Sequence, residues 1–165
     1  MARSPDAPAR WPHALDRHGI KPGDRVATLA WNTHRHIEAW YGIAGIGAIY
    51  HTLNPRLFPD QIVYIANHAE DRVMFFDITF APLVEQIAPN FPPSSCSSCL
   101  TDTANLPKAN IRNLVAYEDF IAGAAENFAW RTSTSIRPAV FAIPPARPAI
   151  RKACCIPIAP MFCMR

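Results

Sequence analysis

Short apolar runs alternate with helical patterns along the chain, and this alternation limits the folds that it can adopt. Val26–Ala30 is a compact apolar run, and Arg72–Asp77 is a second run rich in β-prone residues. Between them, Asn32–Leu53 and the segment after Pro59 repeat apolar residues at three- and four-residue spacing, which is typical of helices. Strands separated by helices pair in parallel, and the helices cover the sheet. We therefore expect an α/β fold, with a partial parallel sheet and flanking helices.

The alternation continues and is then interrupted twice. A helix is predicted over Thr79–Pro89, a strand over Leu114–Ala116, and a helix from Tyr117. Pro93–Cys99 stands where the pattern needs a further strand, but it consists of proline, serine and cysteine. The segment from Thr132 onward has six prolines after Arg137 and no apolar periodicity. Such local conflict with the rest of a fold is unusual in natural sequences.

The charge of the chain is unevenly distributed. The whole sequence carries 16 Lys and Arg against 13 Asp and Glu, but six of the basic residues and no acidic residue follow Asn127. The first 126 residues therefore have a net charge of −3 and no basic, aromatic-interleaved stripe, so we expect no nucleic-acid partner. Met1–Arg10 has no apolar core of a signal peptide, and Trp40–Tyr50 is too short to span a bilayer. We expect no transmembrane segment and a cytoplasmic location.

The five cysteines form two groups. Cys96 and Cys99 make a C-x-x-C pattern, and Cys154, Cys155 and Cys163 lie near the end of the sequence. A structural zinc site needs four ligands at suitable spacing. The adjacent Cys154 and Cys155 are poorly spaced to supply the second pair of ligands. We expect no metal, and a cysteine-based metal or redox protein remains a weaker alternative.

Several other features allow a functional and a structural interpretation. Gly42–Gly47 (GIAGIG) has the spacing of a dinucleotide loop but lies within or at the end of a helix, so close packing of that helix against the sheet is favoured. His34 and His36 are two residues apart on a helix and therefore face different ways, which favours solvated or capping roles. Asn54-Pro55-Arg56 is expected to be a turn, with contact to substrate or a dimer partner as the alternative. The aromatic residues Trp31, Trp40 and Tyr41 are expected in the core or on a helix face.

Three blocks carry a resemblance to a known family. These are GDRVA (Gly23–Ala27), NPRL (Asn54–Leu57) and HAEDRVMFFD (His68–Asp77). The chain is similar to the N-terminal part of the AMP-forming acyl-CoA synthetases, the fatty-acyl-CoA ligases of the adenylate-forming superfamily, from about His13 to Pro89 and again over Leu100–Trp130.

The resemblance implies a reaction and its cofactors. The intact enzyme would join a fatty acid to ATP with Mg²⁺, giving an acyl-adenylate and pyrophosphate, and the thiol of CoA would then displace AMP. Residues 1–131 would be the N-terminal fragment of the AMP-binding domain. The Mg²⁺-binding acid, the adenine-binding segment and the catalytic lysine would lie beyond Arg165, and the intact enzyme could be a homo-oligomer.

The family's phosphate-binding loop is expected at Ala142–Ala153 but cannot be read there. If the gene is read one base earlier, the codons of this segment can encode CYTSGTTGNPKG, which matches the family loop. Read in the same way, the codons of Pro93–Cys99 can encode AVELFVV. We therefore interpret 93–99 and 132–165 as out of frame, and the latter as a disordered tail. Whether the first ten or so residues are in frame is left open.

These interpretations predict the properties of the polypeptide. We expect no catalytic residue, no in-frame cofactor-binding residue and no bound cofactor, and hence an inactive piece of a fatty-acid–CoA ligase that folds marginally because strands are lost. The alternative is a non-catalytic α/β module that associates with intact homologues. The sequence does not indicate the acyl chain length.

Overall fold

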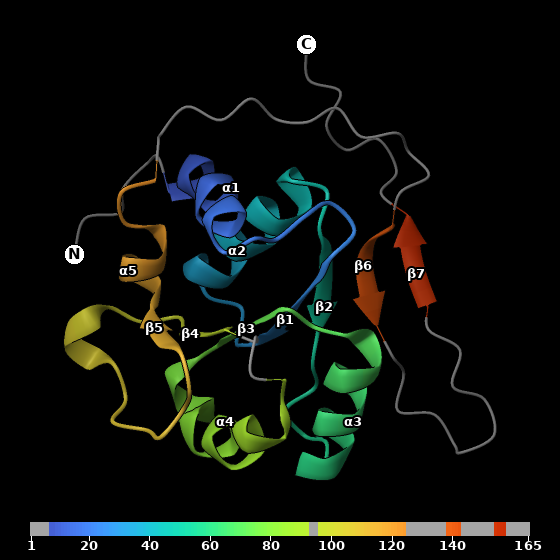
Figure 1. Cartoon of the computed structure of the whole chain (residues 1–165), viewed down its shortest axis with the longest axis vertical. Coiled ribbons are helices and arrows are strands. Elements are labelled where there is room, and N and C mark those ends of the chain that lie inside the picture. Colours follow the sequence, from blue (N-terminus) through green and yellow to red (C-terminus); the bar gives the residue numbers. More distant parts are fainter. Residues whose placement is uncertain (1–6, 93–95, 125–137, 143–153, 158–165) are drawn as a thin grey trace.

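The computed structural model describes residues 7–92, 96–124, 138–142 and 154–157, which form one sheet with helices on both faces (Figure 1). The strands in these ranges are β1 Arg25–Leu29, β2 Ile49–Thr52, β3 Val73–Phe76, β4 Cys96–Cys99, β5 Leu114–Ala116, β6 Pro138–Ala142 and β7 Cys154–Pro157. The α-helices are α1 Ala7–Arg17, α2 His34–Gly45, α3 Pro59–Ala69, α4 Ala81–Ile87 and α5 Tyr117–Ile121. Three 3₁₀ turns, η1 Ile78–Phe80, η2 Ala88–Asn90 and η3 Thr103–Asn105, complete the set.

The strand order is β5-β4-β3-β1-β2-β6-β7. Strands β1 to β6 pair in parallel, whereas β7 runs antiparallel to β6 at one edge. The predicted α/β class and parallel sheet are therefore confirmed, with an antiparallel edge strand that the sequence did not suggest. Parallel neighbours need crossover connections, and here helices α2, α3 and α4 supply them.

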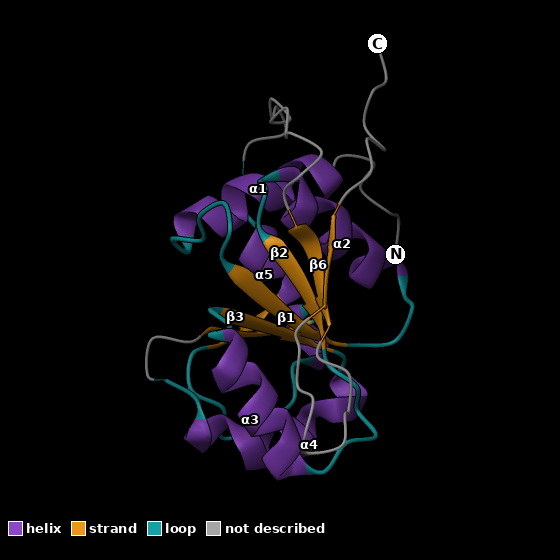
Figure 2. Ribbon diagram, turned by 90° about the vertical axis from the view of Figure 1, so that its right-hand side faces the viewer, coloured by secondary structure: helices purple, strands orange, loops and turns teal. Residues whose placement is uncertain are grey.

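The sheet lies between two groups of helices (Figure 2), and a hydrophobic core fills the space on each side of it. One core lies between the sheet and α1, α2 and α5, and includes Trp11, Ile43 and Phe75. The other lies between the sheet and α3 and α4, and includes Ile62 and Phe76. A strand between two cores must be apolar on both faces, which explains why β3 is a continuous buried run rather than an alternating one.

Local signals set the ends of the helices. The Thr33 hydroxyl caps α2 by accepting a hydrogen bond from the backbone N–H of His36. Pro59 occupies the first turn of α3, where its missing N–H is harmless. Glu70 ends α3 in the left-handed conformation with φ 55°.

The helix predicted over Asn32–Leu53 is too long. It ends at Gly45, and Gly47 follows with φ +78°, a conformation that no ordinary residue adopts easily. Ile49–Thr52 then forms β2, which pairs with β1. Apolar residues continue through the helix, turn and strand without interruption, so the hydrophobic pattern hides the boundary.

The predictions of lost strands are also wrong. Cys96–Cys99 forms β4 and pairs with both β3 and β5, although its residues have low β-propensity. In the segment expected to be a disordered tail, Pro138–Ala142 and Cys154–Pro157 form β6 and β7. Backbone hydrogen bonding to strands already in place can select a strand that side-chain patterns do not indicate. Residues 93–95, 132–137, 143–153 and 158–165 lie outside the described residues.

Candidate functional site at the carboxyl edge of the sheet

The carboxyl edge of the sheet contains a topological switch point. After β1 the chain passes to α2 on one face, and after β3 it passes to η1 and α4 on the other. Because β1 and β3 are neighbours, their following loops diverge. Open α/β sheets bind ligands at such a point, outside the carboxyl ends of the strands. This edge is therefore the place in the fold where a substrate site is expected.

Aromatic and polar side chains connect the two diverging loops. The indole Nε1 of Trp31 donates a hydrogen bond to Oγ1 of Thr79 at 3.0 Å, and its ring lies 5.1 Å from that of Phe80. The Asp77 carboxylate accepts from the backbone N–H of Thr79 at 3.2 Å. Trp31 is 52% exposed and lies in the loop before α2, so its predicted place in the core or on a helix face is wrong. With the exposed Ile78 it leaves apolar surface at this edge.

The segment expected to bind phosphate begins at this same edge. Strand β6 runs parallel to β2 and ends at Ala142, so the chain leaves it at the carboxyl side of the sheet. The segment from 142 to 153 contains three prolines, which lack backbone N–H groups, and no glycine, serine or threonine. A phosphate cradle is built from backbone N–H and hydroxyl donors. The segment does contain three basic residues, Arg147, Arg151 and Lys152. Of this segment the structure describes Ala142 alone, so the loss of a phosphate-binding loop here stays a prediction.

The turn Asn54-Pro55-Arg56 follows β2 at the carboxyl edge, next to β6. The Asn54 side chain accepts a hydrogen bond from the backbone N–H of Arg56 at 3.0 Å, which confirms the predicted turn. Asn54 and Arg56 are exposed. Contact of this turn with substrate or a dimer partner stays a prediction.

The two histidines of α2 have separate environments. His34 is exposed, as predicted, whereas His36 is buried and its Nε2 hydrogen-bonds the Tyr50 hydroxyl. A solvated or capping side chain at His36 is therefore a wrong prediction. Burial lowers the pKa of His36, and the Trp31 carbonyl and the Asp77 carboxylate partly oppose that effect. His34 and His36 therefore do not form a pair of metal ligands.

A buried polar chain crosses the first core and was not found from the sequence. Trp11 Nε1 donates to the Tyr117 hydroxyl at 3.2 Å, and that hydroxyl donates to the Glu38 carboxylate. Burial and the hydrogen bond to Glu38 raise the pKa of Tyr117, so the hydroxyl keeps its proton and acts as the donor. Glu38 lies on the helical pattern of α2 among charged and apolar neighbours. Nothing local marks it as buried.

A second buried pair, also missed, joins β2 to the loop before β3. The His51 Nδ1 lies 2.8 Å from an Asp71 carboxylate oxygen, and both side chains are nearly inaccessible. Burial raises the pKa of Asp71 above its ordinary value, although His51 and Arg25 act against the rise. Both members hold elements of the fold together, since His51 lies within β2 and Asp71 lies in the loop that leads into β3. We assign this pair a structural role.

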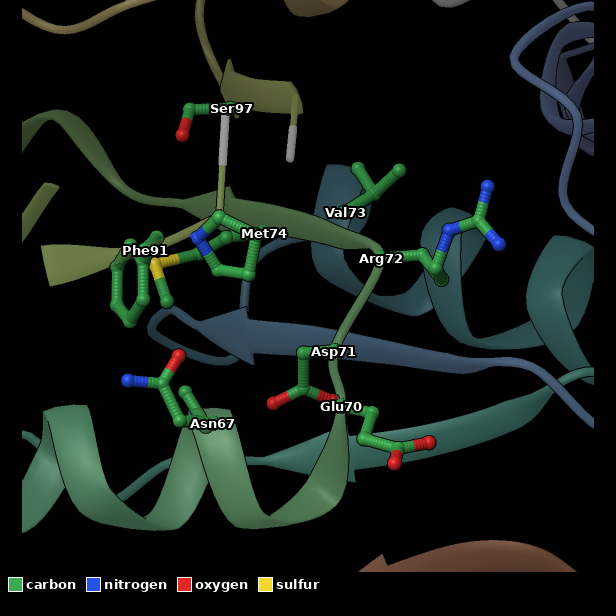
Figure 3. A pocket seen from close by; sticks show the side chains of 10 residues that line it. Asn67, Glu70, Asp71, Arg72, Val73, Met74, Phe91 and Ser97 are labelled. Carbon is green, nitrogen blue, oxygen red and sulfur yellow. The ribbon is translucent and has the colours of Figure 1, made fainter. Parts of the chain in front are cut away.

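A pocket lies at the opposite, amino edge of β3 and β4 (Figure 3). Its volume is about 160 Å³, and it is lined by Ala66, Asn67, Glu70, Asp71, Arg72, Val73, Met74, Phe91, Pro92 and Ser97. In an open parallel sheet this is the edge away from the substrate site. The pocket is therefore separate from the switch point and from the end of β6.

The described residues give no support to a metal centre. Cys96 and Cys99 lie on opposite faces of β4 because they are three positions apart in a strand, and both are free thiols. Burial raises the pKa of Cys99 to about 12, which makes it a poor metal ligand. Among the residues with described positions, no three His, Cys, Asp or Glu side chains cluster around a possible ion. No helix in this part of the chain is long and apolar enough to cross a membrane.

Gly42 has the packing role predicted for GIAGIG, but its partner differs. An added Cβ would lie 2.2 Å from the Cβ of Trp11, so the glycine allows α2 to approach α1 rather than the sheet. The dinucleotide interpretation does not apply, since no strand immediately precedes this glycine.

Comparison with known proteins identifies the family of this chain. The family model described as "AMP-binding enzyme" matches residues 9–139. A 3-methylmercaptopropionyl-CoA ligase from Ruegeria pomeroyi is 46% identical over 72% of this chain and 23% of its own length. A medium-chain-fatty-acid–CoA ligase from Ectopseudomonas oleovorans is 41% identical over 71% of this chain and 21% of its own.

The solved structures give the same fold. An acyl-CoA synthetase from Brucella canis superposes with a TM-score of 0.73 at 20% identity, covering 92% of this chain and 26% of that one. The chain thus spans about a quarter or less of the length of these proteins. The long match to the family model and the two ligases agree, and the chain belongs to the AMP-binding enzyme family.

Proposed function

We propose that the chain is the N-terminal part of a fatty-acid–CoA ligase and that the 165-residue polypeptide alone does not carry out the reaction. The intact enzyme would use ATP, Mg²⁺ and CoA to form an acyl-adenylate and then an acyl-CoA. The observation that carries the ligase assignment is the identity of 46% and 41% to two ligases whose names specify aliphatic acyl groups. This favours an aliphatic carboxylic acid as the substrate class.

The inactivity of the polypeptide follows from the segment after β6. Catalysis of adenylation depends on positioning the phosphates and neutralising their charge. The proline-rich segment from 142 to 153 lacks the glycine and hydroxyl residues that such positioning needs. At the switch point, Trp31 and Asp77 are each hydrogen-bonded to Thr79. Arg35, in the first turn of α2, forms an ion pair with Glu118.

ATP–pyrophosphate exchange tests both parts of the proposal. The 165-residue chain is incubated with ATP, Mg²⁺, labelled pyrophosphate and saturated fatty acids of increasing length, with benzoate as an aromatic comparison. We expect no exchange above the control without acid. Exchange by this chain would overturn the proposed inactivity.

The gene with its frame restored provides the matched control. A full-length product read one base earlier after the Trp130 region should exchange pyrophosphate with at least one aliphatic acid and not with benzoate. A folded full-length product that is inactive with every acid would overturn the ligase assignment. A preference for benzoate would overturn the substrate class alone.

A further inference from the structure

Strand β4 occupies an inner position of the sheet, but its side chains are small and partly polar. It lies between β3 and β5, and its sequence is Cys96-Ser97-Ser98-Cys99. Ser97, Ser98 and Cys99 are buried. The neighbouring β3 has the sequence Val-Met-Phe-Phe, which is the composition expected of a strand covered on both faces.

The register assigns the β4 side chains to the two cores in alternation. Cys96 and Ser98 pair with Val73 and Phe75, which belong to the core beneath α1, α2 and α5. Ser97 and Cys99 pair with Met74 and Phe76, which belong to the core beneath α3 and α4. Each core therefore receives two β4 side chains, and larger side chains at these positions would bury more apolar surface in each core.

Each face of β4 borders a pocket that opens to solvent. The pocket of about 160 Å³ is lined by Ser97 together with Ala66, Met74 and Phe91 of the second core (Figure 3). A second, open pocket of about 380 Å³ is lined by Cys96, by Val73, Leu114 and Val115, and by the polar residues His18, Arg72 and Asn113. A larger side chain at either position would cover apolar surface in these pockets, and burial of apolar surface stabilises a fold.

Ser98 shows the same mismatch in its hydrogen bonding. Its Oγ is fully buried, and among the described residues it has no hydrogen-bond partner. A buried hydroxyl without a partner destabilises a fold, and an apolar side chain of similar size would not. Ser98 faces Phe75 across the ladder, so its surroundings suit an aliphatic group.

The genetic code connects these three observations. Cysteine codons begin with TG. Reading one base earlier turns these two bases into the last two of a new codon, and every codon that ends in TG encodes Leu, Met or Val. Serine codons of the TCN type give codons ending in TC, which encode Phe, Leu, Ile or Val. We propose that positions 96–99 are sites for large apolar side chains, and that Cys-Ser-Ser-Cys stands there because this segment is read in a displaced frame.

Cavity-filling variants of the full 165-residue chain test the proposal. Ser97→Phe places a ring in the pocket beneath α3, Cys96→Leu fills the pocket on the other face, and Ser98→Val removes the unpartnered hydroxyl. Ala104→Phe, at an exposed position in η3, is the control for adding an aromatic ring without filling a cavity. The readout is the midpoint of thermal and urea unfolding.

We expect each of the three β4 variants to raise Tm, Ser97→Phe by about 4 °C or more. The combined triple variant should exceed each single one, because the side chains serve separate cores. If the parent chain unfolds without a cooperative transition, the triple variant should acquire one. Ala104→Phe should leave the unfolding midpoint unchanged.

Two outcomes would overturn the proposal. The first is a lower or unchanged Tm for both Ser97→Phe and Cys96→Leu, which would mean that β4 is adapted to its small residues. The proposal is also overturned if Ser97→Phe yields no soluble protein and the unfolding midpoints of Cys96→Leu and Ser98→Val are unchanged. The second is a gene sequence in which the codons read one base earlier over 96–99 contain a polar residue or a stop.

Discussion

Replacement of Gly42 by alanine tests the close contact between α1 and α2. The added Cβ would lie 2.2 Å from Cβ and 2.6 Å from Cγ of Trp11, far inside the ~3.5–4.0 Å at which carbon atoms attract. Trp11 cannot move aside easily, because it is fully buried and its ring lies 4.8 Å from Phe75 and 5.5 Å from Phe120. The two helices must therefore separate.

The expected loss of stability combines two opposing effects. Alanine in place of glycine within a helix contributes about 1 kcal/mol in favour of folding. Overpacking a well-filled core costs about 1–3 kcal/mol, and a contact as short as this one belongs at the upper end. We expect Gly42→Ala to lower the free energy of unfolding by about 2 kcal/mol and Tm by about 5 °C or more. Ala44→Gly on the same helix serves as a control, because its change in unfolding free energy measures the difference in helix propensity between alanine and glycine.

A double-mutant cycle identifies the cause. Trp11→Ala alone should cost about 3–5 kcal/mol, as for other large-to-small core substitutions. In the Gly42→Ala background the same truncation should cost less, with a coupling of about 0.5–3 kcal/mol, because it also relieves the clash. An increase in Tm for Gly42→Ala, or free energies that simply add, would refute the proposed contact.

The capping, titration and buried-polar features give three further predictions. Thr33→Ala should lower the stability of the fold by about 1 kcal/mol, as measured by urea unfolding, because it removes the side-chain cap of α2. Burial lowers the pKa of His36, so the unfolded state takes up a proton first; stability should decrease as pH falls below about 6.5, and His36→Gln should flatten this dependence. His18, whose pKa burial also lowers, should account for a residual slope. Tyr117→Phe should cost about 1–3 kcal/mol, since Glu38 loses a buried donor, and a change below about 0.5 kcal/mol would contradict the assigned hydrogen bond.

The sequence predicts the elements whose patterns are clean. Val73–Phe76 is apolar throughout and Val26–Ala30 is interrupted only by Thr28, because both segments lie between two helical layers. Strands β3 and β1 form there. The helix after Pro59 also forms as expected. Helix α1 was not predicted, since Pro12 lies inside it and weakens the helical signal, even though Trp11, Ala14 and Leu15 share its buried face.

Tertiary context determines what the sequence does not reveal. Strand β4 forms because its backbone pairs with strands on both sides, whereas its side chains argue against a strand. The buried contact between Glu38 and Tyr117 joins residues 79 positions apart, so no local motif could indicate it. The position of the switch point at the carboxyl edge depends on the order of the strands in the sheet. That order depends on long-range contacts that a single sequence does not display.

The central position of β1 has a consequence for synthesis of the chain. The first strand made is also the one that both β2 and β3 join, on opposite sides, and β4 and β5 extend the β3 side in chain order. A nascent polypeptide can thus add each of these strands to an existing neighbour without waiting for distant sequence. Deletion of β1 would remove the template from which the sheet grows in both directions, whereas loss of β7 would remove a single edge.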